Sequence, residues 1–245
     1  MSRPAPWATA VLAQAGVEAR LAARRGENLL AMVGVPVAVL LFFGVFVLAR
    51  GAVGEMLPGT LALAIVASGL VNLGIATAYE RGYGVLKRLG GSPLGSSGLV
   101  VAKLGVVVAI ALAQVGGLIA VAALVLGWRP DPEASVLAVA VTTVVGAAAF
   151  AGLGLAIAAS FRPEAALVVA NVLFLLALGF SGAVVPIGDL PAPLAGIVRV
   201  LPMGALTEAF ASALGSGGAF ATPLAIVGAW AIASLLVAAR TFRWD

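Results

Sequence analysis

Long apolar runs, broken by short polar stretches, set the pattern of this chain. The runs are built of Ala, Val, Leu, Ile and Gly without regular alternation of polar and apolar positions, which favours α-helices over the strands of a membrane barrel. A helix needs about 20 mostly apolar residues to cross a bilayer. Six runs qualify, at about residues 29–49, 57–78, 98–126, 134–159, 165–185 and 219–239. The pattern predicts an all-α membrane protein with six transmembrane helices, forming one domain over residues 1–245.

Two further segments are neither spans nor short loops. In residues 1–28 the apolar positions lean to one face of a helix, largely apart from charged residues such as Glu18 and Arg24. This is typical of an amphipathic interfacial helix. Residues 186–218 are apolar but contain four prolines, which exclude one straight helix. We expect short re-entrant helices there, on the outer face.

Lys and Arg are divided unevenly between the two sides that these spans define. With six spans both termini lie on one side, and the opposite side keeps only Arg50, Arg129 and Arg199. Basic residues concentrate on the cytoplasmic side of membrane proteins. We therefore place both termini and the connection at residues 79–95 in the cytoplasm. Charges near the N-terminus also interrupt any apolar core of a cleavable signal peptide.

Composition agrees with a membrane protein and removes several kinds of chemistry. The chain is 62% hydrophobic and 10% charged, with a mean hydropathy of +1.17, whereas soluble domains are about half apolar and a quarter charged. It has no His and no Cys, which excludes catalytic triads and metal sites built on those residues, and disulfides. The net charge of +4 fits topology and anionic lipid better than nucleic acid.

The connection at residues 79–95 concentrates charge between two apolar runs. It reads YERGYGVLKRLGGSPLG and predicts a short polar helix from Glu80 to Leu89, within which only Gly82 and Gly84 could break the helix. The glycines and proline that follow end it. Within one helix Arg81 and Arg88 are seven residues apart and share a face. A simpler interpretation stays open, in which these basic residues only orient the chain and meet lipid headgroups.

The order of residues in this connection resembles the membrane-spanning permeases of ABC-2 type transporters, such as daunorubicin-resistance exporters. The shared features are an acidic–basic pair, a glycine, a leucine with basic residues and a Ser-Pro-Leu turn, here Glu80, Arg81, Gly84, Leu86, Lys87, Arg88, Leu89, Ser92, Pro93 and Leu94. Lys103 followed by Gln114, the N-terminal helix and the proline-rich segment before the last span also resemble this family. The likeness runs in order along the whole chain.

The resemblance implies a permease dimer, of two copies or of paralogues, that docks two cytoplasmic ABC ATPase subunits. Residues 79–95 would form the coupling helix, with contacts through Glu80, Arg81, Tyr83, Gly84, Leu86, Lys87, Arg88 and Pro93. Its basic residues would make charge-assisted contacts to acidic residues of the ATPase. The N-terminal helix would brace the ATPase, anchor to lipid, or do both.

The chain itself lacks the Gly-rich loop with a lysine that holds nucleotide phosphates. The carboxylates also fall in separate loops, so no site for bond chemistry is readable. We therefore expect no enzyme activity and no cofactor in this chain, with ATP and Mg bound by the partner ATPase.

Few polar residues lie within the predicted spans, and four are candidates to line a transport pathway: Asn72, Lys103, Gln114 and Asn171. Polar groups at membrane depth usually face protein or a cavity. The alternative for the amides is hydrogen bonding between helices. For Lys103 it is anchoring at the inner interface, with the amine extended toward the headgroups.

Together these features predict the permease subunit of an ABC exporter in a bacterial inner membrane. It would move a hydrophobic or amphipathic compound, a drug or a lipid, by alternating access. Its partners would be the ATPase, a second permease and membrane lipid, and no nucleic acid. Two alternatives stay open. A stand-alone secondary transporter would need acidic coupling residues at the bilayer midplane, and a non-transporting membrane scaffold would need none.

Overall fold

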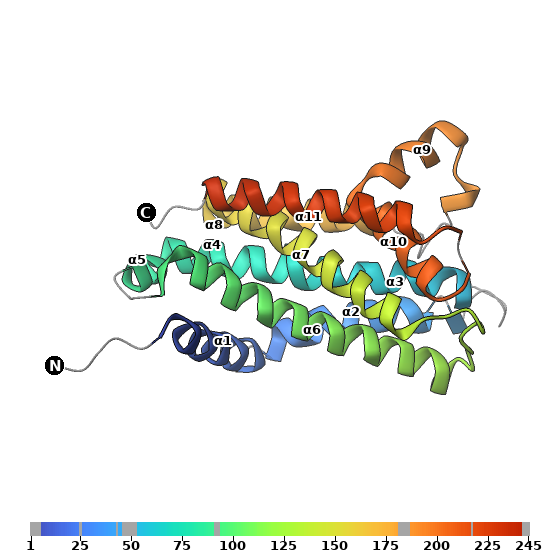
Figure 1. Ribbon diagram of the computed structural model, residues 1–245, viewed down its shortest axis with the longest axis horizontal. Helices are drawn as coiled ribbons and strands as arrows, with labels where there is room; N and C mark the ends of the chain where they lie inside the picture. The colour runs from blue at the N-terminus through green and yellow to red at the C-terminus, as the bar shows by residue number, and fades with distance from the viewer. Residues whose placement is uncertain are drawn as a thin grey trace.

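Long helices packed side by side form the body of the molecule (Figure 1). The structure is a computed structural model that describes residues 6–24, 26–42, 44–45, 53–90, 94–180, 187–216 and 218–241, without the side chains of residues 26–32, 88–90 and 96. The elements in chain order are α1 (Trp7–Arg24), α2 (Gly26–Phe42), α3 (Val53–Ile65), the π-helix η2 (Val66–Leu73), α4 (Gly74–Gly82), α5 (Val85–Gly90), α6 (Gly95–Val125), α7 (Val136–Ser160), α8 (Pro163–Gly179), the 3-10 turn η3 (Ile187–Asp189), α9 (Ala192–Val200), α10 (Pro202–Ala213) and α11 (Ala221–Thr241). Over these residues the all-helical prediction is confirmed.

Four of the predicted spans have counterparts among the described residues. The helices long and apolar enough to cross a membrane are Val53–Gly82, Ser97–Val125, Val136–Ser160 and Ala221–Thr241. The first of these joins α3, η2 and α4 into one run and extends past the predicted end at residue 78. A fifth span is added if the bent pair α9–α10 is taken as one.

The two remaining predicted spans, at residues 29–49 and 165–185, correspond to shorter helices. Their apolar parts are Val33–Phe42 and Pro163–Gly179. The 17 residues of α8 reach only about 25 Å at 1.5 Å per residue, less than the roughly 30 Å of a bilayer core. Residues 46–49 and 181–185, which would complete these spans, lie outside the described part. The six-span arrangement therefore stays a prediction.

The run Val53–Gly82 is the centre of the bundle. In its most apolar stretch 78% of residues are buried, against 28% to 50% for the other three long helices. α7 packs on this run and on α11, and its glycines allow the closest contacts. A Cβ atom on Gly154 would come within 2.5 Å of the carbonyl oxygen of Gly69 in η2. Small residues therefore set the distance between these two helices.

The proline-rich segment before the last helix forms short helices, as its prolines predict. Pro202 begins α10, which turns by 88° from the preceding α9. Two contacts hold the bend: the Arg199 Nε lies 2.7 Å from the Glu208 Oε1, and the Trp230 Nε1 of α11 donates to the Val200 carbonyl at 2.9 Å. α9 projects from the end of the bundle farthest from α5 (Figure 1).

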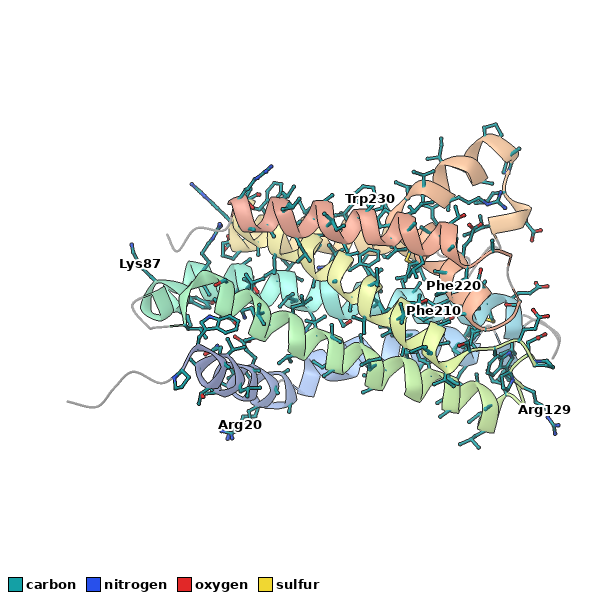
Figure 2. The ribbon with its side chains drawn as sticks, in the orientation of Figure 1. Arg20, Lys87, Arg129, Phe210, Phe220 and Trp230 are labelled. Carbon is teal, nitrogen blue, oxygen red and sulfur yellow. The ribbon has the colours of Figure 1, made fainter. Side chains whose placement is uncertain are left out.

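The two ends of the bundle differ in charge. α1, α5, the start of α8 and the end of α11 lie at one end (Figure 1), hereafter the basic end, and α9 and the α6–α7 connection lie at the other. Among the side chains that the structure describes, the basic end carries Arg20, Arg24, Arg81, Lys87, Lys103, Arg162 and Arg240. The opposite end has Arg129 and Arg199. Figure 2 shows Arg20 and Lys87 at the basic end and Arg129 at the other.

Candidate functional site

The predicted coupling helix is two helices joined by a turn. α4 ends at Gly82, Tyr83 caps it, and α5 begins at Val85. Gly84 adopts φ of +71°, a left-handed conformation that costs glycine little and other residues about 1–2 kcal/mol. The expectation of one helix from Glu80 to Leu89 is therefore wrong. Arg81 and Arg88 do not share a helix face, because the break at Gly84 separates them.

α5 and the turn before it present a small exposed surface at the basic end. Tyr83 is 74% exposed, and Val85 and Lys87 are also exposed. Leu86 points the other way and is buried with Leu94, Leu99 and two residues of α1. Contacts of the predicted coupling residues with a partner stay predictions, and the Arg88 side chain and Pro93 lie outside the described part.

Lys103 of α6 joins three helices. Its Nζ lies 2.7 Å from the Glu80 Oε2 of α4 and 3.0 Å from the Glu18 Oε2 of α1, and Gln14 donates to Glu18 at 2.9 Å. Only 2% of Lys103 is exposed. The alternative interpretation, in which its amine extends to the headgroups, is wrong, because two carboxylates hold the amine inside the protein. A buried cation without such partners would carry a large desolvation cost.

Arg81 joins the same segment to the end of α7. Its guanidinium donates to the carbonyl oxygen of Ala159 and, at 2.6 Å, to that of Phe161. Carbonyls at a helix C-terminus lack partners within the helix and carry partial negative charge, so a cation is favourable there. Glu80 and Arg81 thus connect α4 to α1, α6 and α7. Their side chains have partners within the chain, and contact of either with an ATPase stays a prediction.

Of the four candidate lining residues, only two lie at the same cavity. Asn72 and Lys103 line one cavity of about 50 Å³ between α1, η2, α4 and α6. Gln114 is buried and lines a larger cavity of about 340 Å³ between α2 and α6. Asn171 lies apart on α8, where its amide donates to the Leu167 carbonyl of its own helix at 2.8 Å. A pathway through these residues is untested.

Glu18 is a site residue that the sequence did not reveal. The sequence places Glu18 on the charged face of a surface helix, and 85 residues separate it from Lys103. Helical spacing relates residues three, four or seven apart and cannot pair residues so distant. The available signal was that Glu18 is an acidic residue in a predominantly basic helix.

The arrangement is suited to holding helices together and offers no evident centre for bond chemistry. Across the described ranges, no group of three or more His, Cys, Asp or Glu side chains is placed to hold a metal ion. Glu18, Glu80 and Lys103 form ion pairs, and Arg81 caps the end of α7. The basic end also carries an exposed surface on α5 that nothing in the described chain covers.

Apolar helices of spanning length around a buried helix define a multi-pass membrane protein. The ABC-2 type transporter family model matches residues 11–214, from α1 to the end of α10. The chain therefore belongs to the ABC-2 type transporter family, whose members are membrane permeases of ABC transporters, generally without catalysis of their own, and pair with an ABC ATPase. In the other comparisons, no curated protein and no solved structure matches the chain.

Proposed function

We propose that this chain is the permease subunit of an ABC exporter whose energy enters through α5. The observation that supports this most is the surface of Tyr83, Val85 and Lys87, which is exposed at the basic end and linked through the adjoining α4 to three other helices. Tyrosine is enriched among the residues that dominate binding between proteins, and the exposed Lys87 can make a charge-assisted contact with an acidic partner. ATP and Mg would be bound by the partner ATPase, and this chain would carry no cofactor.

The orientation follows from the charge of the two ends. The basic end would face the cytoplasm of a bacterium, because basic residues concentrate on that side of the inner membrane. Both termini would then be cytoplasmic. α1 would lie along the inner surface, since Leu12, Val17 and Leu21 are exposed and can enter the lipid beside it.

The contacts at the basic end give a physical route for coupling. A push on α5 by a closing ATPase would reach α4 across the turn at Gly84. From α4 it would reach α6 and α1 through the Glu80–Lys103–Glu18 ion pairs and α7 through Arg81. Spans linked in this way can switch between two arrangements together, as alternating access requires. The cargo would be hydrophobic or amphipathic, a drug or a lipid, moved outward by a dimer of permeases.

The test is ATP hydrolysis by the permease purified with the ATPase encoded beside it. We expect Lys87→Glu to lower permease-dependent hydrolysis about tenfold, equivalent to about 1.4 kcal/mol, because it reverses an exposed charge on the docking surface. Arg240→Glu is the matched control, since Arg240 is an exposed cation at the same end but on α11. Equal activity of the two variants, or a permease that binds no ATPase, would refute the proposal.

A further inference from the structure

A partly exposed ion pair lies at the bend between α9 and α10. The Arg199 Nε is 2.7 Å from the Glu208 Oε1, and the two side chains are 53% and 34% exposed. Beside Arg199, the Val200 carbonyl accepts from Trp230 of α11 (Figure 2). Trp230 is nine residues from the start of α11, about 14 Å at 1.5 Å per residue. The bend therefore lies well within the length of a membrane-spanning helix.

The depth of this ion pair limits what can cover it. Charged side chains within membrane-spanning regions almost always face protein or a water-filled cavity, because exposure to hydrocarbon is costly. The exposed surface of Arg199 and Glu208 is therefore unsuited to contact with lipid chains. A second protein or water must cover it.

The apolar side chains around the ion pair favour protein over water. Ile197 is 61% exposed, Val200 is 60% exposed and Leu201 is 41% exposed, and burial of such surface is favourable. A Cβ on the exposed Gly196 would meet no atom within 4 Å, so another helix can approach α9 closely there. Lipid would suit the apolar side chains but not the charges, and water would suit only the charges. A protein surface suits both.

The two charges also indicate which protein fits. Arg199 and Glu208 place one positive and one negative charge side by side, so the surface is complementary to itself. In a two-fold contact the same patch of both copies meets, and each residue faces the counterpart of its neighbour. Arg199 would then face the partner's Glu208, and Glu208 would face the partner's Arg199. Several charges that alternate in sign form a network, which stabilises a contact more than one exposed pair does.

We propose that α9 and α10 form a contact between two copies of this chain, in which each Arg199 pairs with the partner's Glu208. The second permease would then be an identical copy and not a paralogue. The inference rests on the permease dimer of the proposed function, but it is independent of ATPase docking.

The first test measures self-association of the permease without the ATPase, from copies that carry two different affinity tags. Arg199→Glu and Glu208→Arg each give a copy with two like charges. We expect either variant to associate with itself about tenfold more weakly than the unaltered chain. Copies of the two variants mixed together should associate about as well as the unaltered chain, because opposite charges then meet across the contact.

This mixing separates a contact between chains from one within a chain, because a second copy cannot restore an ion pair that acts only within one chain. Association of the mixed copies as weak as that of each variant alone would overturn the proposal. Undiminished association of each variant with itself would also overturn it.

The second test leaves the charges unaltered and uses the absence of cysteine from the chain. Ile197→Cys on α9 should give a covalent dimer when membranes are treated with a short bismaleimide. Ile232→Cys is the matched control, because Ile232 is 65% exposed and Ile197 is 61% exposed, but Ile232 lies on α11. Equal yields of covalent dimer at the two positions would overturn the proposal. ATPase docking on α5 is measured separately, through Lys87→Glu, so the two proposals can fail independently.

Discussion

Lys103 is a buried cation whose two partners come from helices far apart in the sequence. Its side chain is 1% exposed, and the side chains of Glu18 and Glu80 are each 13% exposed. A buried ion pair adds little to folding stability compared with apolar residues in place of the whole pair. Removal of one partner, however, leaves a buried charge that is neither solvated nor paired, which destabilises the fold. The three residues should therefore behave as one unit.

Lys103→Met should destabilise the protein by about 3 kcal/mol, at the lower end of the range for a broken buried pair. The measurement is the thermal unfolding midpoint of the purified permease in detergent. Lys87→Met is the control, because Lys87 is exposed and such substitutions usually change stability by less than about 0.5 kcal/mol. Adding Glu18→Gln and Glu80→Gln to Lys103→Met should recover part of the loss. A midpoint for Lys103→Met no lower than that of Lys87→Met would contradict the role of the ion pairs.

At the scale of elements, the contact between α7 and η2 depends on glycine. Gly154→Ala should lower the unfolding midpoint, because its Cβ would meet the Gly69 oxygen at 2.5 Å and the Leu70 oxygen at 3.0 Å. These atoms belong to the backbone, so the helices must separate, at a cost of about 1–3 kcal/mol. In Gly105→Ala the new Cβ meets no atom within 4 Å, and better helix propensity should raise stability by up to about 1 kcal/mol. Equal unfolding midpoints for the two variants would show that the contact at Gly154 does not set how closely α7 and η2 pack.

The helices themselves were largely predictable from sequence, whereas their joints were not. Apolar length identified the four long spans, and prolines identified the short helices between residues 186 and 218, because each feature acts within a few turns of chain. The break at Gly84 was not predictable, because the sequence offers both Gly82 and Gly84 as breakers and does not show that either one interrupts the helix. Glycine is tolerated within helices, and only the backbone geometry shows that this one is left-handed. The prediction that Arg81 and Arg88 share one helix face was wrong for the same reason.

The sequence predicted some of the residues of the candidate site but not how they are arranged. Its charged segment and Lys103 were identified, because charge is rare in an apolar chain and marks function or contact. Which charges face inward depends on pairs such as Glu18 with Lys103, which only the packed bundle brings together. Exposure then separates Tyr83 and Lys87, which are open to a partner, from the buried Leu86.

At the scale of the whole molecule, the two ends of the bundle have different tasks in this account. The basic end would receive the ATPase, and the opposite end, with α9 and the α6–α7 connection, would face the outside. The match of the ABC-2 type transporter family to residues 11–214 covers elements at both ends. The assignment of sides rests on charge, and the docking surface rests on exposure, so one experiment can address both.

That experiment is photo-crosslinking in intact membranes of cells that contain the ATPase encoded beside this chain. A photoreactive phenylalanine analogue replaces either Tyr83, 74% exposed beside α5, or Val136, 88% exposed at the start of α7 and at the opposite end. The analogue at position 83 should form an adduct with the ATPase, and the analogue at position 136 should form none. The absence of an adduct at position 83, or an equal yield at both positions, would contradict this expectation.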